Sequence, residues 1–154
     1  MENDFNLIQR IRPIFSKPGG RNIKYAIVDN FLNFWFRFIY KYQSAVEIGN
    51  FEYLRTIVER DYSTYSGKML ERYFIEKLAA FKNYSAIGTY WEKGNQSEID
   101  VVALNDLEKT VLFVEVKRKK ENISLPVLQE KAKNLLAQLK GYDAEFKGLS
   151  IEDM

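Results

Sequence analysis

The sequence predicts a mixed α/β fold in which a helix, three strands, a second helix and a last strand follow one another from Gly67 onward. Two observations lead to this prediction. Apolar residues recur at helical spacing after Gly67 and again after Pro126. Between these segments lie three short runs rich in β-branched and aromatic residues, a composition typical of buried strands. The 154 residues allow one medium domain or two small ones.

Residues 1–29 are expected to form a β-hairpin. Two apolar-rich runs, Phe5 to Phe15 and Asn22 to Val28, flank a Pro-Gly-Gly turn at 18–20. An isolated two-stranded hairpin is only marginally stable in water. This segment must therefore pack against other parts of the protein.

Residues 30–65 are expected to form a helical connecting segment. Asp29 or Asn30 suits the N-cap of its first helix. Aromatic residues then recur on one helical face, which favours an aromatic core over a ligand-stacking surface. These residues are Phe31, Phe34, Trp35 and Phe38. A second short helix is expected over Phe51 to Glu59.

Residues 66–154 contain the predicted αβββαβ order. Its first helix carries an apolar stripe from Leu70 to Phe81 that includes one acid, Glu71. Strands are expected at Tyr84–Trp91, Glu98–Leu104, Thr110–Lys117 and Phe146–Ile151. The last helix is expected from Pro126 to about Tyr142, with Leu128, Ala132, Leu135 and Leu139 buried and with Lys131, Lys133 and Lys140 on its solvent face.

The hairpin over residues 98–117 carries the chemistry. Pairing its strands across a turn at Asn105–Lys109 places Ile99, Val101 and Ala103 opposite Val116, Val114 and Leu112 on one apolar face. The same register sets Asp100 against Glu115 and Glu98 against Lys117. Two carboxylates about 5 Å apart suit a Mg²⁺ or Mn²⁺ ion. A solvated strand end with a Glu98–Lys117 ion pair is the alternative, but the apolar alternation through Val116 favours a covered sheet.

The amino-acid composition excludes several kinds of metal and catalytic site. The chain has no cysteine and no histidine, which excludes disulfides, zinc fingers and sites built on a Cys or His side chain. Any metal is therefore a hard cation bound by oxygen. Lys plus Arg number 23 and Asp plus Glu number 21, so the net charge of +2 does not by itself indicate a nucleic-acid binder.

These residues resemble a known superfamily. Glu71 on a helix, then Asp100, then Glu115-Val116-Lys117 within an αβββαβ order resemble the PD-(D/E)XK phosphodiesterases, which have the restriction-endonuclease-like fold. Ile99 stands where many members have proline. Gln138 and Tyr142 resemble the Q-x-x-x-Y element that some members carry on the helix after the lysine.

A narrower resemblance covers nearly the whole chain. Tyr25 to Tyr40 and the closing segment Gly148 to Met154 are similar to the carboxy-terminal domain of archaeal and bacterial AAA ATPases of uncharacterised function. In that family a P-loop ATPase module and a winged helix precede the nuclease-like domain. The resemblance implies that residues 1–29 are the remnant of the winged helix and its wing. It also implies that this chain, which has no phosphate-binding loop motif, is either a fragment of such a protein or a degenerate gene product.

The resemblance implies roles for individual residues. Asp100, Glu115 and the backbone carbonyl of Val116 would bind Mg²⁺ or Mn²⁺, and Lys117 would position the attacking water. Glu71 would complete the acidic cluster as a fourth catalytic residue. The implied supporting residues are Glu98, Gln138 and Tyr142, and the implied phosphate contacts are Arg118, Lys119 and Lys120. A solvated loop is the alternative for these three basic residues.

Three functions follow as hypotheses. The first is a metal-dependent nuclease domain acting on DNA, normally the carboxy-terminal part of an AAA ATPase. The second is a catalytically silent nuclease-fold module that binds nucleic acid or regulates an ATPase. The third is a structural fragment whose hairpin and aromatic helix form a homodimer. The polar, acidic start and the short, interrupted aromatic stretch at Phe31–Tyr40 predict a cytoplasmic protein with no membrane partner.

Overall fold

The computed structural model describes residues 7–17, 19–92, 94 and 97–154. They form two compact units. The first comprises the described residues up to Arg12 together with Ile23–Tyr65, and the second comprises Pro13–Asn22 together with Ser66–Met154. The first unit begins with β1 (Ile8–Ile11) and β2 (Lys24–Ile27), which pair antiparallel as the hairpin pattern predicts. Pro18 of the predicted turn and residues 1–6 lie outside the described residues.

The helical part of the first unit starts with α1 (Asn30–Phe34). Asp29 caps this helix by accepting the backbone N–H of Leu32 at 2.8 Å. A π-helical turn at Trp35–Ile39, a 3₁₀ turn at Tyr40–Tyr42 and α2 (Gln43–Glu47) follow. Phe38 is fully buried but Phe31 is exposed, so the predicted four-residue buried face is wrong at Phe31. The π-helical turn changes the residues-per-turn spacing on which that prediction depended.

Helix α3 (Phe51–Ala80) is one continuous helix of 30 residues. The sequence predicted two helices with a break between Glu59 and Gly67, and this prediction is wrong. The segment between Glu59 and Gly67 contains no proline and no residue with a positive φ. On each side of it, an ion pair joins two residues that lie one helical turn apart, Arg55 with Glu59 and Arg72 with Glu76. Gly67 lies inside the helix, where it lowers helix propensity without ending the helix.

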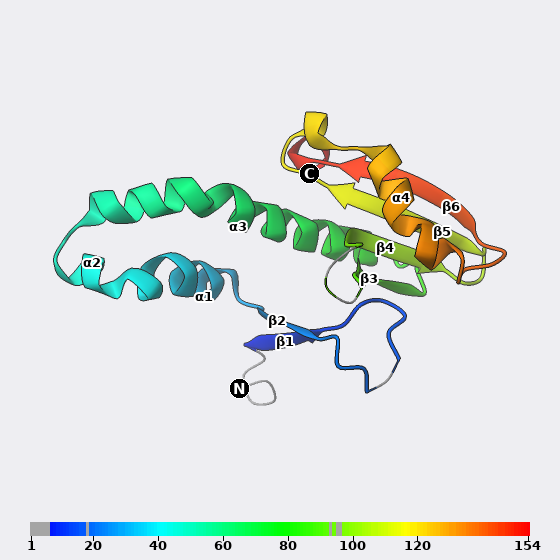
Figure 1. Cartoon of the computed structure of the whole chain (residues 1–154), viewed down its shortest axis with the longest axis horizontal. Coiled ribbons are helices and arrows are strands. Elements are labelled where there is room, and N and C mark those ends of the chain that lie inside the picture. The colour runs from blue at the N-terminus through cyan, green and yellow to red at the C-terminus, as the bar shows by residue number, and fades with distance from the viewer. Residues whose placement is uncertain (1–6, 18, 93, 95–96) are drawn as a thin grey trace. The chain divides into compact units, whose positions relative to one another are not determined.

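The second unit contains a four-stranded sheet (Figure 1). Its strands are β3 (Ala86–Tyr90), β4 (Ile99–Asn105), β5 (Thr110–Val116) and β6 (Asp143–Leu149), in that spatial order. The first three are antiparallel, and β6 is parallel to β5. Helix α4 (Leu125–Leu136) makes the crossover between β5 and β6. With α3 before β3, the element order matches the predicted αβββαβ order.

Each face of the sheet is covered by a helix. On one face Leu70 and Phe74 of α3 pack against alternate residues of β4 and β5, namely Val101, Ala103, Leu112 and Val114. On the other face Leu128, Ala132 and Leu135 of α4 pack against Val102, Leu104, Val111 and Phe113. The second unit is therefore a three-layer α/β/α core. The apolar runs of β4 and β5 arise because both faces of these strands are buried.

The predicted register of β4 and β5 is confirmed from the pair Val101–Val114 to the turn, and the ladder ends before the predicted pair of Asp100 with Glu115. Val101 lies opposite Val114, and Ala103 lies opposite Leu112. One position departs from the predicted faces: Ile99 joins the core on the α4 side instead of the face that holds Val101. Ile99 changes face because the β3–β4 pairing shifts its register: Gly88 pairs with Val102, but Tyr90 pairs with Ile99. Such a bulge reverses the side-chain alternation beyond it.

The predicted end of the last helix is also wrong. Helix α4 ends at Leu136, and Gln138 and Tyr142 lie in the turns that lead to β6. Gly141 has a φ of +83°, a left-handed conformation that reverses the chain before Asp143. Gln138 and Tyr142 therefore share no helical face. None of the helices in the described part of the chain carries an apolar stretch long enough to cross a membrane.

Candidate active site

Asp100 and Glu115 lie at the same end of the β4–β5 pair. Asp100 is the second residue of β4, and Glu115 is the last but one of β5. Because these strands are antiparallel, the start of one lies beside the end of the other. Oδ2 of Asp100 accepts the backbone N–H of Val116 at 2.8 Å, which ties the aspartate to β5.

The β-bulge lies at this position. Between the pairs Gly88–Val102 and Tyr90–Ile99, the residues Asp100 and Val101 of β4 face the single residue Thr89 of β3. Bulges of this kind are common beside active sites because they re-aim one side chain. Here the bulge falls on the predicted metal ligand of β4.

Glu115 is held in place by the segment that follows β5. Its side chain is only 6% exposed, and its Oε2 accepts the backbone N–H of Ser124 at 2.8 Å. Gly148 of β6 pairs with Glu115 in the parallel ladder. A Cβ on Gly148 would come within 2.3 Å of Cγ2 of Ile123, the residue before Ser124. The missing side chain of Gly148 therefore lets this segment approach closely enough for Ser124 to reach Glu115.

Lys117 contacts both carboxylates. Its Nζ lies 3.3 Å from Oε1 of Glu115 and 3.6 Å from Oδ2 of Asp100. Burial disfavours the ammonium charge, but the carboxylates of Asp100 and Glu115 outweigh it and raise the pKa of Lys117. Lys117 therefore stays protonated near neutral pH, so it serves as a hydrogen-bond donor and a positive charge.

Glu71 approaches the same site from α3. Burial, together with the nearby negative charge of Asp100, raises the pKa of its carboxyl group. Lys68 offsets part of this effect, because its Nζ lies 3.5 Å from Glu71 and 3.8 Å from Glu98. The structure thus brings Glu71 and Glu98 beside the Asp100–Glu115–Lys117 group. Glu71 interrupts the apolar stripe of α3 because this position of the helix lies next to Asp100.

The donor set fits a hard cation with two protein carboxylates. Backbone N–H groups engage Oδ2 of Asp100 and Oε2 of Glu115. Oε1 of Glu115 faces the ammonium groups of Lys117 and Lys131, so a cation has to compete with both lysines for this oxygen. Among the described residues, no three acidic side chains come close enough together to hold one ion. Mg²⁺ is often bound by one or two carboxylates, with water and substrate phosphate oxygens completing its shell. Asp100 and Glu115 supply two such carboxylates.

Gln138 and Tyr142 lie elsewhere. The hydroxyl of Tyr142 donates to the carboxylate of Asp106 and accepts from Nζ of Lys109 at 3.4 Å. Both partners belong to the β4–β5 turn, at the opposite end of the hairpin from Asp100. Gln138 donates to the backbone carbonyl of Asn134 at 3.2 Å. The structure therefore does not bring the predicted Q-x-x-x-Y pair to the carboxylates.

The three predicted phosphate contacts follow Lys117 along the chain between β5 and α4. Arg118 is half-buried, whereas Lys119 and Lys120 are exposed. Lys119 forms an ion pair with Glu121 at 3.4 Å, with both side chains largely in solvent. Exposed pairs of this kind contribute little to stability, so these lysines remain available to a large anionic ligand.

Sequence reasoning missed Lys131. This residue of α4 was expected on the solvent face, but its Nζ lies 3.9 Å from Oε1 of Glu115 and its side chain is only 33% exposed. The available signal was its position, three residues after Leu128 and four before Leu135, which places it at the margin of the buried face.

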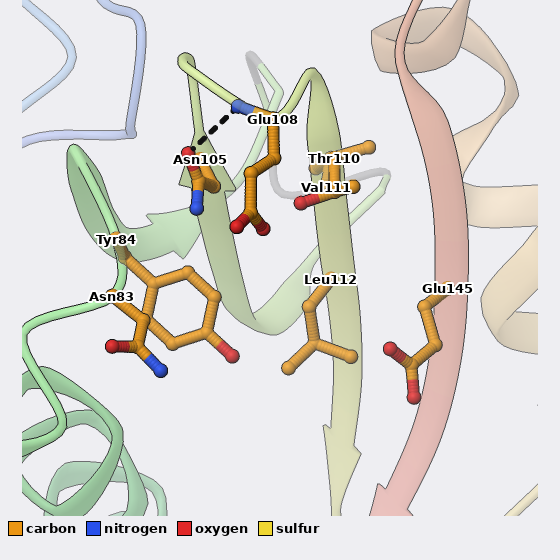
Figure 2. Close-up of a pocket in the computed structure, with 8 residues that line it drawn as sticks. All are labelled: Asn83, Tyr84, Asn105, Glu108, Thr110, Val111, Leu112 and Glu145. Atoms are coloured by element: carbon orange, nitrogen blue, oxygen red, sulfur yellow. Dashed lines mark hydrogen bonds between the residues drawn. The ribbon is translucent and has the colours of Figure 1, made fainter.

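A shallow pocket of about 150 Å³ lies away from these carboxylates, around the β4–β5 turn. Figure 2 shows its lining, with Tyr84, Leu112 and Glu145 facing one another and the Glu108 N–H donating to Asn105. Burial and the nearby Glu145 raise the pKa of Tyr84. None of the predicted site residues lines this pocket, and the carboxylate–lysine group is the better candidate for chemistry.

The chain resembles other proteins over most of its length. Residues 35–135 match the DUF234 family, described as archaeal and bacterial proteins of unknown function. The matched region includes the carboxylates, Lys117 and Lys131 and ends before Gln138. An uncharacterised protein of Methanocaldococcus jannaschii is 36% identical over an alignment of 123 residues that covers 75% of this chain.

The aligned part is only 27% of the Methanocaldococcus jannaschii protein, so this chain spans about a quarter of that relative's length. No solved structure matches the chain. The family match covers well over half of the residues. The chain therefore belongs to the DUF234 family of archaeal and bacterial proteins.

Proposed function

We propose that this chain is a metal-dependent phosphodiesterase domain of the PD-(D/E)XK type that acts on DNA. The observation that supports this most is the shared lysine: Nζ of Lys117 lies within 3.6 Å of Asp100 and within 3.3 Å of Glu115. Two carboxylates and one lysine on adjacent strands make up the proposed catalytic set. Glu71 of α3 adds a third acid beside it.

Each residue has a role in this proposal. Asp100 and Glu115 hold Mg²⁺ or Mn²⁺, with the carbonyl of Val116 as a further ligand. When bound, the ion supplies a Lewis acid that stabilises negative charge on the phosphoryl group. Lys117 donates a hydrogen bond that orients the attacking water, because its raised pKa keeps it protonated. The water oxygen then bonds to phosphorus as the P–O ester bond breaks. The water releases one proton to solvent, and the departing oxygen takes up one proton to leave as an alcohol.

The fold supports the same proposal. The observed αβββαβ order, with one helix on each face of the sheet, agrees with a restriction-endonuclease-like core. In this proposal the β-hairpin of the first unit is a remnant of a winged helix. The domain is normally the carboxy-terminal part of an AAA ATPase. The Methanocaldococcus jannaschii relative is long enough to include such a module, because most of its length lies outside the match.

A silent nuclease-fold module is the second candidate, and one observation favours it. Lys117 and Lys131 both contact Glu115, so two ammonium groups already balance the charges of Asp100 and Glu115. A site that is neutral without a cation can serve as a structural ion-pair network. In this case the domain would bind nucleic acid or regulate an ATPase.

Cleavage assays separate the two candidates. Plasmid, single-stranded and branched DNA would be incubated with Mg²⁺ or Mn²⁺ and with wild type, Asp100→Asn or Lys117→Gln. Asp106→Asn and Lys109→Gln are matched controls, because these residues form an exposed ion pair on the same hairpin. Cutting by wild type and both controls, but by neither site variant, would support the phosphodiesterase. No cutting by wild type under any condition would favour the silent module.

A further inference from the structure

Glu115 is shared by two lysines from different elements. Lys117 at the end of β5 lies 3.3 Å from Oε1, and Lys131 of α4 lies 3.9 Å from the same oxygen. The other oxygen of Glu115 is engaged by the backbone N–H of Ser124. Both lysines therefore compete for one carboxylate oxygen.

The charges of this group explain why two lysines are present. Asp100 and Glu115 together carry two negative charges, and Lys117 and Lys131 carry two positive charges. With a divalent cation on the carboxylates, the same group has a net charge of about +2 and attracts an anion. Oε1 of Glu115 cannot stay close to the cation and to both ammonium groups without strong repulsion between them.

Lys131 is the lysine that can move. Lys117 also contacts Asp100 and follows directly from β5. Among the described residues, the ammonium group of Lys131 pairs with the carboxylate of Glu115 and with no other. Lys131 has a long flexible stem that starts on a helix, and one third of its side chain is in solvent. Its ammonium group can therefore leave Glu115 without disturbing the sheet.

We propose that Lys131 is a phosphate-binding residue that is held on Glu115 in the metal-free protein and turns to a non-bridging oxygen of the phosphodiester when the carboxylates bind a cation. This inference rests on the proposed function and extends it. Lys131 thereby couples cation binding to DNA binding. It offsets the charge of Glu115 in the empty site and supplies a positive charge to the substrate only in the loaded site.

The test uses Lys131→Gln with Lys133→Gln as the matched control. Lys133 lies two residues away on the same helix and pairs with Glu130 in solvent. Mn²⁺ affinity would be measured by calorimetry without DNA. Affinity for a fluorescent DNA duplex would be measured by anisotropy over a range of salt concentrations, once with Ca²⁺ and once with a chelator.

Lys131→Gln is expected to bind Mn²⁺ several-fold more tightly than wild type, because one competing cation has been removed. In Ca²⁺ it is expected to bind DNA about ten-fold more weakly, the effect of one charged hydrogen bond. Its salt slope is expected to fall by about 1. In chelator its DNA affinity should equal that of wild type, and Lys131→Arg should restore binding in Ca²⁺. Lys133→Gln should match wild type throughout.

Two results would overturn the inference. If wild type binds Mn²⁺ and DNA but Lys131→Gln matches Lys133→Gln in both assays, the proposed function stands and the role of Lys131 is wrong. If wild type binds no Mn²⁺ at all, both the proposed function and the role of Lys131 are wrong. A folded state of each variant would be confirmed by its thermal unfolding curve.

Discussion

Val116 donates its backbone N–H to Oδ2 of Asp100 at 2.8 Å, so a side chain of β4 bonds to the backbone at the end of β5. The regular ladder between these strands runs only as far as Val101 and Val114. Beyond it the carboxylate takes the place of a backbone acceptor. This bond holds Asp100 where its Oδ2 also lies 3.6 Å from Nζ of Lys117, and it leaves Oδ1 for another ligand.

Asp100→Asn is expected to lower Mn²⁺ affinity by about 100-fold or more, because one of two anionic ligands is lost. The amide oxygen can still accept the Val116 N–H, so the free energy of unfolding in chelator should change by less than about 1 kcal/mol. Calorimetry would give the affinity, and denaturant titration would give the stability.

Thermal unfolding provides an independent check on Asp100→Asn. Mn²⁺ at about 100 times its dissociation constant should stabilise wild type by roughly 2.7 kcal/mol, and the variant should show almost none of this gain. Asp106→Asn, at the other end of the hairpin, should respond like wild type. Equal stabilisation of Asp100→Asn and wild type would show that the ion binds elsewhere.

Glu71→Gln is expected to raise stability at neutral pH in chelator by about 0.5–2 kcal/mol, the size that is common for a single stabilising substitution. Burial and Asp100 raise the folded-state pKa of Glu71, so the folded protein binds this proton more tightly than the unfolded chain does. Wild type therefore loses stability as pH rises from the unfolded pKa of about 4.3 through the raised folded value. The variant has no such loss.

The pH dependence distinguishes this effect from general charge removal. The stability difference between Glu71→Gln and wild type should grow as pH rises above about 4.3 and then become constant. Glu76→Gln serves as the control, because Glu76 is an exposed residue on the same helix that pairs with Arg72. A Glu71→Gln protein that is less stable than wild type at pH 7 would mean that the pair with Lys68 dominates.

Gly148→Ala is expected to weaken the site from a residue with no ligand atom. The new Cβ would lie 2.3 Å from Cγ2 of Ile123, so the segment before α4 has to shift. This shift moves the Ser124 N–H away from Glu115, which loses its backbone partner. Overpacking of this kind costs about 1–3 kcal/mol of unfolding free energy. Mn²⁺ affinity should fall with it.

A second substitution separates the steric cause from other effects. Ile123→Ala removes the atoms that clash, so Gly148→Ala combined with Ile123→Ala should regain Mn²⁺ affinity relative to Gly148→Ala alone. Gly67→Ala is the matched control, since no atom lies within 4 Å of its Cβ position and alanine favours a helix by up to about 1 kcal/mol. Failure of the double variant to recover would refute the steric argument.

The β4–β5 hairpin was predictable because the residues that determine its register are close together in the sequence. Alternating apolar residues and a polar turn set the register, and that register places Asp100, Glu115 and Lys117 at one end. Their contacts with one lysine follow from strand geometry. Helix α3 brings Glu71 because the apolar stripe around it packs on the same sheet.

The remaining features depend on distant parts of the chain. The bulge opposite Thr89 requires the pairing with β3, which no pattern in β4 reveals. Lys131 reaches Glu115 only because of the way α4 crosses the sheet. The end of α4 at Leu136 is set by the turn through Gly141 into β6, although apolar spacing continues to Leu139.

Tyr142→Phe is expected to leave Mn²⁺ affinity and any DNA cleavage unchanged. The hydroxyl of Tyr142 donates to Asp106 and accepts from Lys109, which are exposed residues of the β4–β5 turn far along the strands from Asp100. Losing these bonds should lower the free energy of unfolding only slightly, because Asp106 and Lys109 are in solvent. Asp106→Asn should give a similar loss, and the two effects should not add, because both substitutions break one network. Loss of cleavage in Tyr142→Phe at unchanged stability would instead show that Tyr142 reaches the carboxylates in the active protein, as the Q-x-x-x-Y resemblance implied.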